Sequence, residues 1–443
     1  MNEAGLQSAG DPLEIFCRYR QRRQALFSML DEHAYYSRPI PLRNPIVFYQ
    51  GHIAAFAYNA LVRQASHGPA LDPQLENLFA RGIDPPEGQS TSRARGNEDD
   101  IWPSRRAVEH FCQQADDAVA TALQGLPPGP SPQREAAWRL LEHEAMHHET
   151  LMYLWQQIPI ADKQAPSDYH AHTAGNPPSP SMVHIPAGEV QLGIAPSQRV
   201  FAWDNELPEH RQTVPAFSIH RHKVSNHDYR RFVECGGYED PRWWSREEHH
   251  WLESKQIRHP LLWLKREGQW WWRGMFAEFP LPEAWPVWVS HTEASAYARW
   301  QGMRLPTEAE YQRATFTEPD GSIRDYPWGH AYPNTHHGVF DFTSWDPQPL
   351  ATHPDGCSAW GLHDVVGNGW EWTCTPFAPF PGFQAMSSYP EYSADFFDGE
   401  HIVLKGASPV TPKELLRPSF RNWFRPRYPY VFAGFRCATG AMS

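Results

Sequence analysis

The sequence predicts two units: a bundle of α-helices, then a unit of short strands, short helices and long loops. Apolar residues recur with helical spacing in the first part of the chain. In the second part, short alternating runs stand between stretches rich in Trp and Pro. Residues 164–181 contain Pro and Gly and little to bury, so we expect a linker there. The predicted boundaries are therefore 11–163 for the bundle and 182–440 for the second unit.

The composition narrows the class of protein. The chain has 443 residues with 20 Trp and 43 Pro, which is typical of irregular structure held by aromatic packing. Its net charge of −12 argues against nucleic acid and acidic membrane surfaces as partners. The six cysteines are scattered without a CxxC pair and indicate free thiols in a reducing compartment. With no signal-like start and no apolar run of the roughly 20 residues that span a bilayer, we expect a soluble, cytoplasmic protein.

Four segments of the first unit show helical spacing and are separated by Pro- and Gly-containing stretches: 12–31, 46–66, 104–124 and 133–158. Four helices of this length predict an antiparallel bundle. His52 falls on the second segment, and His143 and His147 fall on the fourth. All three side chains can therefore face one core.

The pair His143 and His147 is the main functional signal, because imidazoles four residues apart on a helix point the same way and can bind one metal ion. With His52 they form a three-imidazole face that leaves coordination positions open for chemistry. The HExxH string also permits a zinc hydrolase with Glu144 as general base, or a purely structural role. His148 and Glu149 point off this face, and we expect them around the site or in solvent.

The second unit begins with alternating runs at 182–185 and 217–220, and helical spacing recurs at 225–235 and 291–301. Its motifs are "MVHIPAGEVQLG" at 182–193, "VPAFSIHRHKVSNHDYRRFV" at 214–233, "PVWVSHTEASAYARWQGMRLPTEAEYQRA" at 286–314, "GLHDVVGNGWEWT" at 361–373 and "FAGFRC" at 432–437. This series resembles the formylglycine-generating-enzyme-like domain, which implies a C-type-lectin-related α+β fold. The resemblance does not extend to that enzyme's activity, because the copper-binding cysteines before "GFR" are missing here.

A DinB-like four-helix bundle followed by this domain resembles the ergothioneine sulfoxide synthases and the related selenoneine synthases. The strings "GHIAAF" and "HEAMHHETL" match the family's metal motifs. The resemblance implies that His52, His143 and His147 bind Fe(II). It also implies two further substrates besides O₂: hercynine, which is the Nα-trimethylated betaine of histidine, and a thiol or selenosugar that is joined to the imidazole C2 of hercynine.

The resemblance also implies substrate contacts. In this family an Asn-Trp pair holds the trimethylammonium group, which has no N–H to donate and is best bound by aromatic faces and oriented oxygens. The matching pair is Asn422 and Trp423, although Trp423 could instead be a core residue. Further candidates for substrate binding, taken from their positions, are Met146, Phe424, Arg425, Arg427 and Arg81.

Two differences from the motifs of the related synthases bear on the identity of the sulfur or selenium donor. Sulfoxide synthases keep a tyrosine near the iron, but the matching stretches here offer Leu78-Phe79 in one place and phenylalanines in the other: Phe377, Phe380 and Phe383. Phe79, Tyr428 and Tyr430 are therefore the candidates for the position or the role of that tyrosine. Phe424, in place of the family's Asp, argues against γ-glutamylcysteine.

A selenol needs no control of sulfoxide formation, and the lead-in "IPLRNPIVFYQGH" also resembles the selenoneine synthases. We therefore expect a selenosugar as the donor. The alternative is a thiol such as cysteine, with a sulfoxide as product. A zinc hydrolase and a non-catalytic, lectin-like binding protein are the remaining hypotheses.

Overall fold

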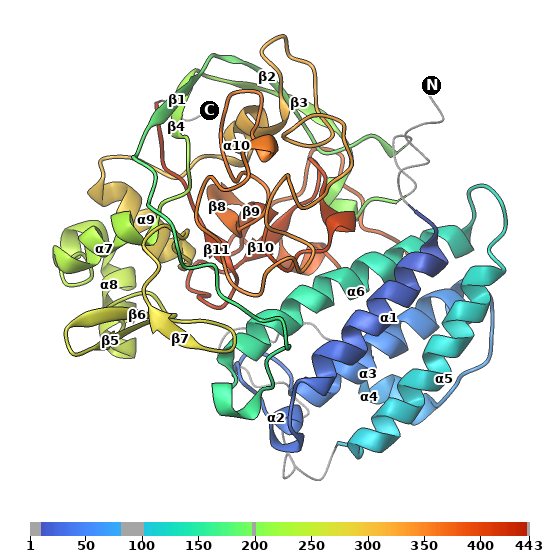
Figure 1. Cartoon of the computed structure of the whole chain (residues 1–443). Coiled ribbons are helices and arrows are strands. Elements are labelled where there is room, and N and C mark those ends of the chain that lie inside the picture. The colour runs from blue at the N-terminus through green and yellow to red at the C-terminus, as the bar shows by residue number, and fades with distance from the viewer. Residues whose placement is uncertain (1–9, 81–101, 197–200, 441–443) are drawn as a thin grey trace. The chain divides into compact units, whose positions relative to one another are not determined.

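The computed structural model describes residues 10–80, 102–196 and 201–440. The chain divides into two compact units, Met1–Tyr169 and His170–Ser443, and the division falls inside the segment 164–181 (Figure 1). Arg81 lies outside the described residues. Across the described ranges, no helix is both long and apolar enough to cross a bilayer.

The first unit is helical. Its α-helices are α1 (Pro12–Ser28), α2 (Glu32–Tyr36), α3 (Ile46–Ala57), α4 (Pro73–Leu78), α5 (Arg105–Gln124) and α6 (Pro132–Gln157). The four long helices α1, α3, α5 and α6 correspond to the four predicted segments, and α1 and α3 each pack against both α5 and α6. The helix α3 continues as a π-helical stretch over Tyr58–Ala65, a form that often accompanies functional sites.

The longest helix, α6, owes its limits to local sequence. Ser131 caps it by accepting a hydrogen bond from the Arg134 N–H (3.2 Å), and Pro132 occupies the first turn, where its missing N–H costs nothing. No Gly or Pro interrupts the helix before Ile158, which precedes Pro159. This uninterrupted length is what carries His143 and His147 into the middle of the bundle.

The second unit mixes short strands and helices, as predicted. Its strands are β1 (Met182–Ile185), β2 (Gly188–Leu192), β3 (His210–Val214), β4 (Phe217–His220), β5 (Trp263–Arg266), β6 (Gln269–Arg273), β7 (Glu278–Pro280), β8 (Gly369–Pro376), β9 (Ile402–Ala407), β10 (Asn422–Phe424), β11 (Ala433–Gly434) and β12 (Ala438–Thr439). Its α-helices are α7 (Asn226–Glu234), α8 (Arg246–Lys255), α9 (His291–Trp300) and α10 (Glu308–Phe316). The helices α8 and α10 were not predicted as elements.

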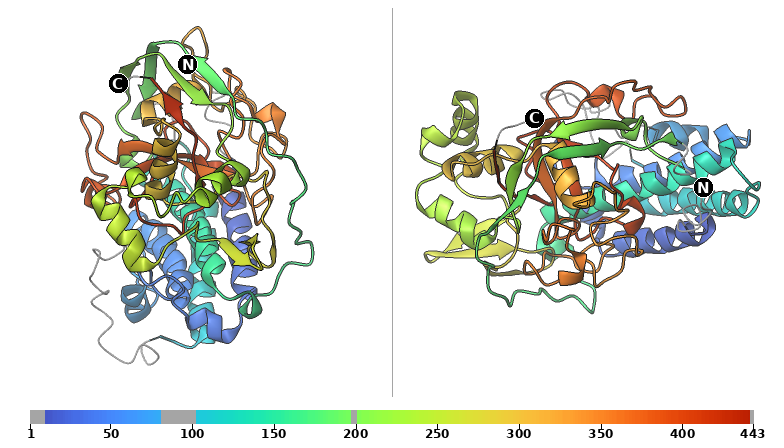
Figure 2. Two further views of the ribbon diagram at one scale, coloured as in Figure 1. Left: turned by 90° about the vertical axis from the view of Figure 1, so that its left-hand side faces the viewer. Right: turned by 90° about the horizontal axis from the view of Figure 1, so that it is seen from above.

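The strands form four small sheets, with the orders β1-β4-β12, β10-β9-β8-β11, β2-β3 and β5-β6-β7. All pairings are antiparallel except that of β8 with β11. The pairing of β1 with β4, which joins the two runs expected to be strands, can be followed in Figures 1 and 2. The four-stranded sheet contains β10, the strand on which the predicted substrate-binding residues Asn422 and Trp423 lie.

The turn into β8 explains the "GNG" string of the sequence. Gly367 and Gly369 have positive φ angles of 95° and 123°. A Cβ on Gly367 would lie 2.7 Å from the Val339 carbonyl oxygen, and one on Gly369 would lie 2.6 Å from Nε1 of Trp288. Only glycine suits both the backbone conformation and the available space. Just beyond this turn, Glu371 forms a fully buried ion pair with Arg436 (2.6 Å).

Candidate metal centre and substrate-binding residues

Three histidines of the first unit converge on one point. His52 comes from α3, and His143 and His147 come from α6, one helical turn apart. The Nε2 atom of His143 lies 3.2 Å from that of His52 and 3.2 Å from that of His147. One potential ligand atom from each residue lies within 4.8 Å of the others, and this is the only such group of three among the described residues.

His52 is oriented by the backbone. Its Nδ1–H donates a hydrogen bond to the carbonyl oxygen of Phe79 (2.8 Å), which leaves Nε2 with a free lone pair toward the centre. The ring of Phe79 is fully buried against Gly51, where any Cβ would come within 2.4 Å of that ring. Phe79 therefore contacts the centre through its carbonyl group, and no sequence pattern predicts a backbone contact of this kind.

Aromatic rings surround the three imidazoles. Phe56 stacks on His143 with ring centroids 3.6 Å apart, and Phe48 stacks on His52 at 5.0 Å. Tyr49 is tilted against His147 at 5.8 Å. All three aromatic residues belong to α3. Tyr49 lies one turn before His52, so the helical spacing of "FYQGH" could have revealed this tyrosine.

The protonation of the three histidines suits metal binding. Burial lowers the pKa of His52 to about 4. The pKa values of His143 and His147 are lowered well below the ordinary value, first by burial and then by the neighbouring histidines. All three imidazoles are thus neutral near pH 7, the form in which histidine binds a metal.

The positions of the three Nε2 atoms indicate a cation-binding site. Because Nε2 of His143 lies within hydrogen-bonding distance of two other imidazole nitrogens, one proton cannot satisfy the three lone pairs, whereas one divalent cation can. Three neutral nitrogen donors fit Fe(II), and they also admit Zn(II) or Co(II).

The alternative of a zinc hydrolase, with Glu144 as general base, does not fit the surroundings of this residue. Glu144 is 1% exposed and forms an ion pair with Arg23 of α1 (3.0 Å) and another with His148 (3.4 Å). Burial alone would raise the pKa of Glu144, but Arg23 and His148 outweigh it and lower the pKa. Arg23 also pairs with Asp116 of α5 at 2.5 Å. A carboxylate tied into this buried cluster does not serve as general base for water bound at the histidines.

His148, expected around the site or in solvent, is fully buried in the same cluster. Glu149, expected in the same places, is also buried. Met146, expected to contact substrate, is half-buried on α6 beside His147. Its carbonyl accepts a hydrogen bond from the Thr150 hydroxyl (3.2 Å). The role of Met146 stays a prediction.

In the second unit, Asn422 and Trp423 lie on β10, which pairs with β9 so that Trp423 is opposite Val403. The Asn422 side-chain oxygen accepts a hydrogen bond from the Trp423 backbone N–H (2.9 Å). Both residues are half-buried. The indole of Trp423 stacks on the ring of Phe377 at 4.2 Å and 7°. Trp423 is thus neither a fully buried core residue nor a free surface residue.

The other candidates of the second unit lie at the end of β10 and in the residues that follow it. The ring of Phe424 stacks on Tyr428 at 5.2 Å, and Tyr428 meets the Tyr430 ring edge-on at 5.0 Å. Burial raises the pKa of Tyr430. Arg425 lies 3.7 Å from a carboxylate oxygen of Glu400, and Arg427 lies 3.8 Å from one of Glu247, which is largely exposed. Both arginines are part-exposed, and the Arg427 guanidinium also lies over the Trp251 ring, 5.9 Å from its centroid.

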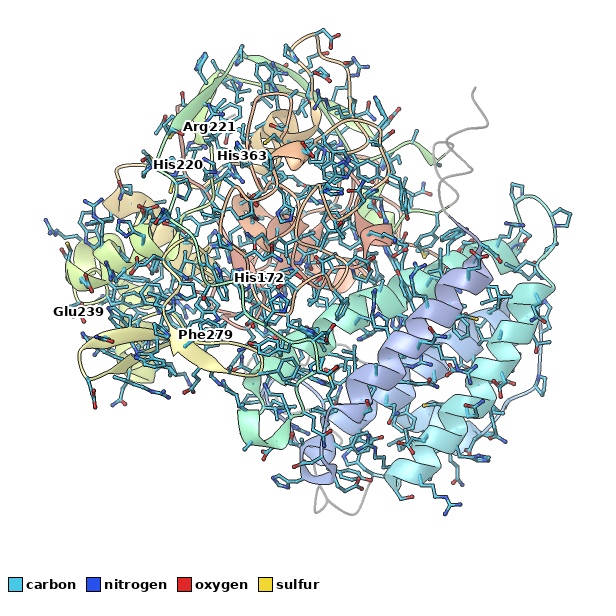
Figure 3. The ribbon with its side chains drawn as sticks, viewed as in Figure 1. His172, His220, Arg221, Glu239, Phe279 and His363 are labelled. Carbon is cyan, nitrogen blue, oxygen red and sulfur yellow. The ribbon has the colours of Figure 1, made fainter. Side chains whose placement is uncertain are left out.

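A second group of histidines has a structural explanation. His220, Arg221 and His363 lie near one another in the second unit (Figure 3), and each of their carbonyl oxygens accepts a hydrogen bond of 3.0 Å from Arg436. Cys357 adds one contact, from its Sγ to Nδ1 of His363 (3.3 Å). The group provides no set of three ligand atoms within the described part of the chain.

Comparison with known proteins accounts for both units. Residues 169–441 match the Sulfatase-modifying factor enzyme 1-like domain family, and residues 16–151 match the DinB superfamily. These assignments agree with the predicted fold class. They also place the three histidines in the DinB part and Asn422 and Trp423 in the other part.

Curated relatives extend over nearly the whole chain. The hercynine oxygenase of Mycolicibacterium smegmatis is 33% identical over 444 residues and covers 98% of both chains. The hercynine oxygenase of Mycobacterium tuberculosis is 34% identical, covering 90% of this chain and 91% of the relative. The Ergothioneine biosynthesis protein 1 of Neurospora crassa is 27% identical over 92% of this chain, which spans 55% of that longer protein.

Proposed function

Because this chain belongs to the hercynine oxygenase family, we propose that it is a non-haem Fe(II)- and O₂-dependent enzyme acting on hercynine. The proposed reaction joins a sulfur donor to the imidazole C2 of hercynine and gives a sulfoxide. The convergence of His52, His143 and His147 is the observation that carries this proposal. The names of the relatives, which are hercynine oxygenases and ergothioneine biosynthesis proteins, support the sulfur reaction.

The overall reaction balances with one O₂. The C2–H of hercynine and the S–H of the thiol are both lost, and a C–S bond forms. One oxygen atom enters the sulfoxide, and the other leaves as water with the two hydrogens. Iron held by the three histidines would supply the one-electron chemistry that lets O₂ react with these substrates.

The protein's own residues prepare this chemistry. The Phe79 carbonyl fixes the orientation of His52, and Phe48 and Phe56 cover the imidazole faces of His52 and His143. An apolar shell of this kind keeps bulk water away and strengthens electrostatic interactions inside the site. It also keeps the histidines neutral, as their lowered pKa values indicate.

For hercynine itself we propose Asn422 and Trp423 as the binding residues, with Trp423 offering its aromatic surface to the trimethylammonium group. Phe424, Arg425 and Arg427 are proposed to contact the donor. Tyr428 and Tyr430 are the proposed proton-donating candidates, because both carry a hydroxyl close behind the Asn-Trp pair.

A selenosugar donor remains the second candidate. The observation in its favour is that phenylalanines stand where the sulfoxide synthases keep a tyrosine: Phe79 in one stretch, and Phe377, Phe380 and Phe383 in the other. The rings of Phe79, Phe377 and Phe380 are buried. The relatives favour the thiol over the selenosugar expected from the sequence. Tyr49, which is not among the predicted site residues, provides a tyrosine next to His147. The turnover experiment described next distinguishes the two donors.

The test is aerobic turnover of the iron-loaded protein with hercynine, offering cysteine, γ-glutamylcysteine and a 1-selenosugar in separate reactions, with products identified by mass spectrometry. We expect a hercynine sulfoxide with a thiol. An adduct only with the selenosugar would establish the second candidate instead. Absence of a hercynine product with every donor would contradict the proposed function.

The protein without iron, prepared with a chelator, and the His147→Ala variant serve as controls. Both should give no product if the reaction depends on the three-histidine centre. Turnover that persists in the chelated protein would move the chemistry away from these residues.

A further inference from the structure

We propose that Phe377 is a positioning residue for hercynine, acting by fixing the indole of Trp423. The inference rests on the proposed function, because it assigns to Trp423 the role of binding the trimethylammonium group. It concerns a position that follows β8 directly, in a stretch where the related sulfoxide synthases carry a tyrosine.

Three side chains form a column. The indole of Trp423 lies nearly parallel to the ring of Phe377, with centroids 4.2 Å apart and planes 7° apart. The guanidinium of Arg421 lies over the Phe377 ring, with its central carbon 4.9 Å from the ring centroid. The same guanidinium lies 4.2 Å from the centroid of Phe380. Phe377 thus connects a half-buried indole to a buried cation.

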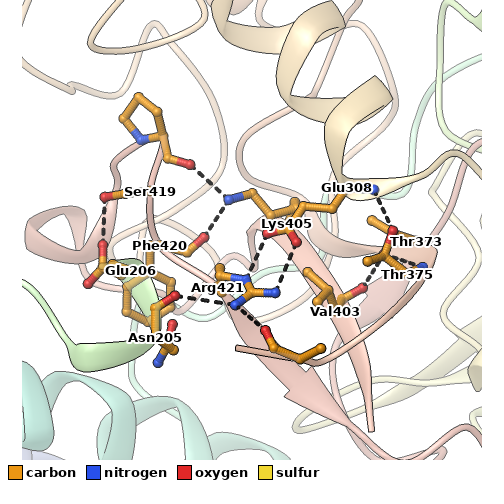
Figure 4. A network of polar contacts seen from close by, with 12 residues as sticks. Asn205, Glu206, Glu308, Thr373, Thr375, Val403, Lys405, Ser419, Phe420 and Arg421 are labelled. Carbon is orange, nitrogen blue, oxygen red and sulfur yellow. Dashed lines mark hydrogen bonds and ion pairs between the residues drawn. The ribbon is translucent and has the colours of Figure 1, made fainter. Parts of the chain in front are cut away.

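The cation is fixed from several sides (Figure 4). Arg421 makes two hydrogen bonds to the Glu308 carboxylate, at 2.9 and 3.1 Å. It also donates to the carbonyl oxygens of Asn205 (3.2 Å) and Ala378 (3.0 Å). Arg421 and Glu308 are 2% and 3% exposed. A paired, two-point contact in a buried setting holds its geometry far better than a surface pair does.

The backbone of Phe377 is fixed as well. Its N–H donates a hydrogen bond of 2.7 Å to the carbonyl of His401, immediately before β9. The bond from Arg421 to the Ala378 carbonyl holds the next residue along. Phe377 is 1% exposed, so its ring has little freedom to move. The position of the Trp423 indole is therefore set by a rigid neighbour.

Two other rings limit Trp423 further. Tyr392 meets the indole edge-on at 5.4 Å, and Phe396 lies tilted at 5.6 Å. Because one indole face is taken by Phe377, a cationic ligand must use the remaining surface. Cation–π attraction depends on the ligand lying over the ring, so a displaced indole binds the trimethylammonium group less well.

The experiment compares Phe377→Leu and Phe377→Met with Phe380→Leu. Phe380 is a matched control, because it is a buried phenylalanine that contacts the same guanidinium but packs its ring against His210, with centroids 4.5 Å apart. Trp423→Ala gives the effect of losing the indole. The readouts are KM for hercynine, KM for the donor, kcat, iron content and the thermal midpoint.

We expect both Phe377 variants to raise the hercynine KM about five- to tenfold, the size of a weakened cation–π contact. Their kcat, donor KM and iron content should stay within about twofold of the wild type. Phe380→Leu should lower the thermal midpoint by about as much as the Phe377 variants do, and should leave the hercynine KM unchanged.

Several outcomes would overturn the inference. One is an equal rise in hercynine KM in Phe380→Leu. Another is an unchanged KM in the Phe377 variants when Trp423→Ala raises it. If neither Phe377 variant folds whereas Phe380→Leu does, Phe377 is a core residue without a positioning role. Failure of the wild-type protein to convert hercynine at all would instead reject the proposed function, and this inference with it.

Discussion

His52 shows how one hydrogen bond can decide which atom of a side chain reaches a site. Because its Nδ1–H is held by the Phe79 carbonyl, Nε2 points to His143 and His147. The two histidines of α6 gain the same direction from their four-residue spacing. One backbone hydrogen bond and the four-residue spacing on α6 therefore direct the three imidazoles toward the same point.

The first prediction concerns these ligands. We expect turnover to be abolished in each of three variants: His52→Ala, His143→Ala and His147→Ala. Each should also lower the affinity for Fe(II), and by more than the roughly 10- to 100-fold that follows the loss of a residue contacting a metal ligand. Iron content after anaerobic loading and a product assay provide the measurement. His33→Ala, an exposed histidine in the same unit, is the control and should behave as the wild type. Normal iron content in any ligand variant would remove that residue from the set.

The second prediction concerns Gly51. A Cβ in Gly51→Ala would lie 2.4 Å from the Phe79 ring, so Phe79 or α3 must shift. We expect a loss of about 1–3 kcal/mol in the free energy of unfolding, and weaker iron binding because the Phe79 carbonyl no longer fits His52. Denaturant titration and iron affinity measure the two effects. Phe79→Leu in the same chain should relieve part of both, and no relief would mean that the strain lies elsewhere.

At the scale of elements, α6 carries two pairs of residues with the same spacing. His143 and His147 face the metal centre, while Glu144 pairs with His148 and with the buried Arg23 of α1, which in turn pairs with Asp116 of α5. The second pair keeps α6 in one rotation about its axis. The metal ligands benefit from this, although Glu144 takes no part in their chemistry.

The third prediction concerns the buried ion pairs that Arg23 forms with Asp116 and Glu144. Arg23→Met leaves the buried carboxylates of Asp116 and Glu144 without their central cation, and should cost about 3–5 kcal/mol of unfolding free energy. Arg20→Met is the control: Arg20 also lies on α1 near Asp116 (3.4 Å) but is 20% exposed, so its removal should cost about 1 kcal/mol or less. Denaturant unfolding distinguishes the two. Equal losses would show that the buried pairing does not stabilise the bundle.

The long helices and the histidine pair of α6 could be predicted from sequence because both depend on local spacing, whereas His52 joined that pair through the family resemblance. The four long helices lie where apolar residues recur, and the histidine pair is separated by one turn. The partners of Glu144 could not be predicted, since Arg23 and Asp116 come from distant helices. The stack of Phe377 on Trp423 likewise depends on the order β10-β9-β8, which no local pattern specifies. The helix α10 was missed although "LPTEAEYQRA" contains its capping box, Thr307 with Glu310.

At the scale of the whole molecule, the predicted combination of a DinB bundle and a sulfatase-modifying-factor domain is confirmed by both family matches. The preference for selenium is not supported by the relatives, which are named for hercynine and ergothioneine. Donor choice depends on a few side chains rather than on the fold, so the architecture leaves it open.

The fourth prediction is that a metal stabilises the folded protein. Fe(II) under anaerobic conditions, at about 100 times its dissociation constant, should add about 2.7 kcal/mol to the free energy of unfolding, because only the folded chain brings the three imidazoles together. Thermal unfolding measures the shift. Mg(II), which prefers oxygen ligands, should have no effect. A shift of the same size in His147→Ala would place the metal elsewhere.

The paired faces of α6 have a consequence for how this helix tolerates change. One inserted or deleted residue turns everything beyond it by about 100° around the helix axis. Between Pro132 and His143, a deletion would bring Glu144 and His148 toward the metal position, whereas an insertion would bring Glu142 and Met146 there. Either change would carry His143 and His147 away from it. Point substitutions on the outer surface of α6 do not change the directions in which its other side chains point. Within the family, the length of α6 up to His148 should therefore vary far less than its composition.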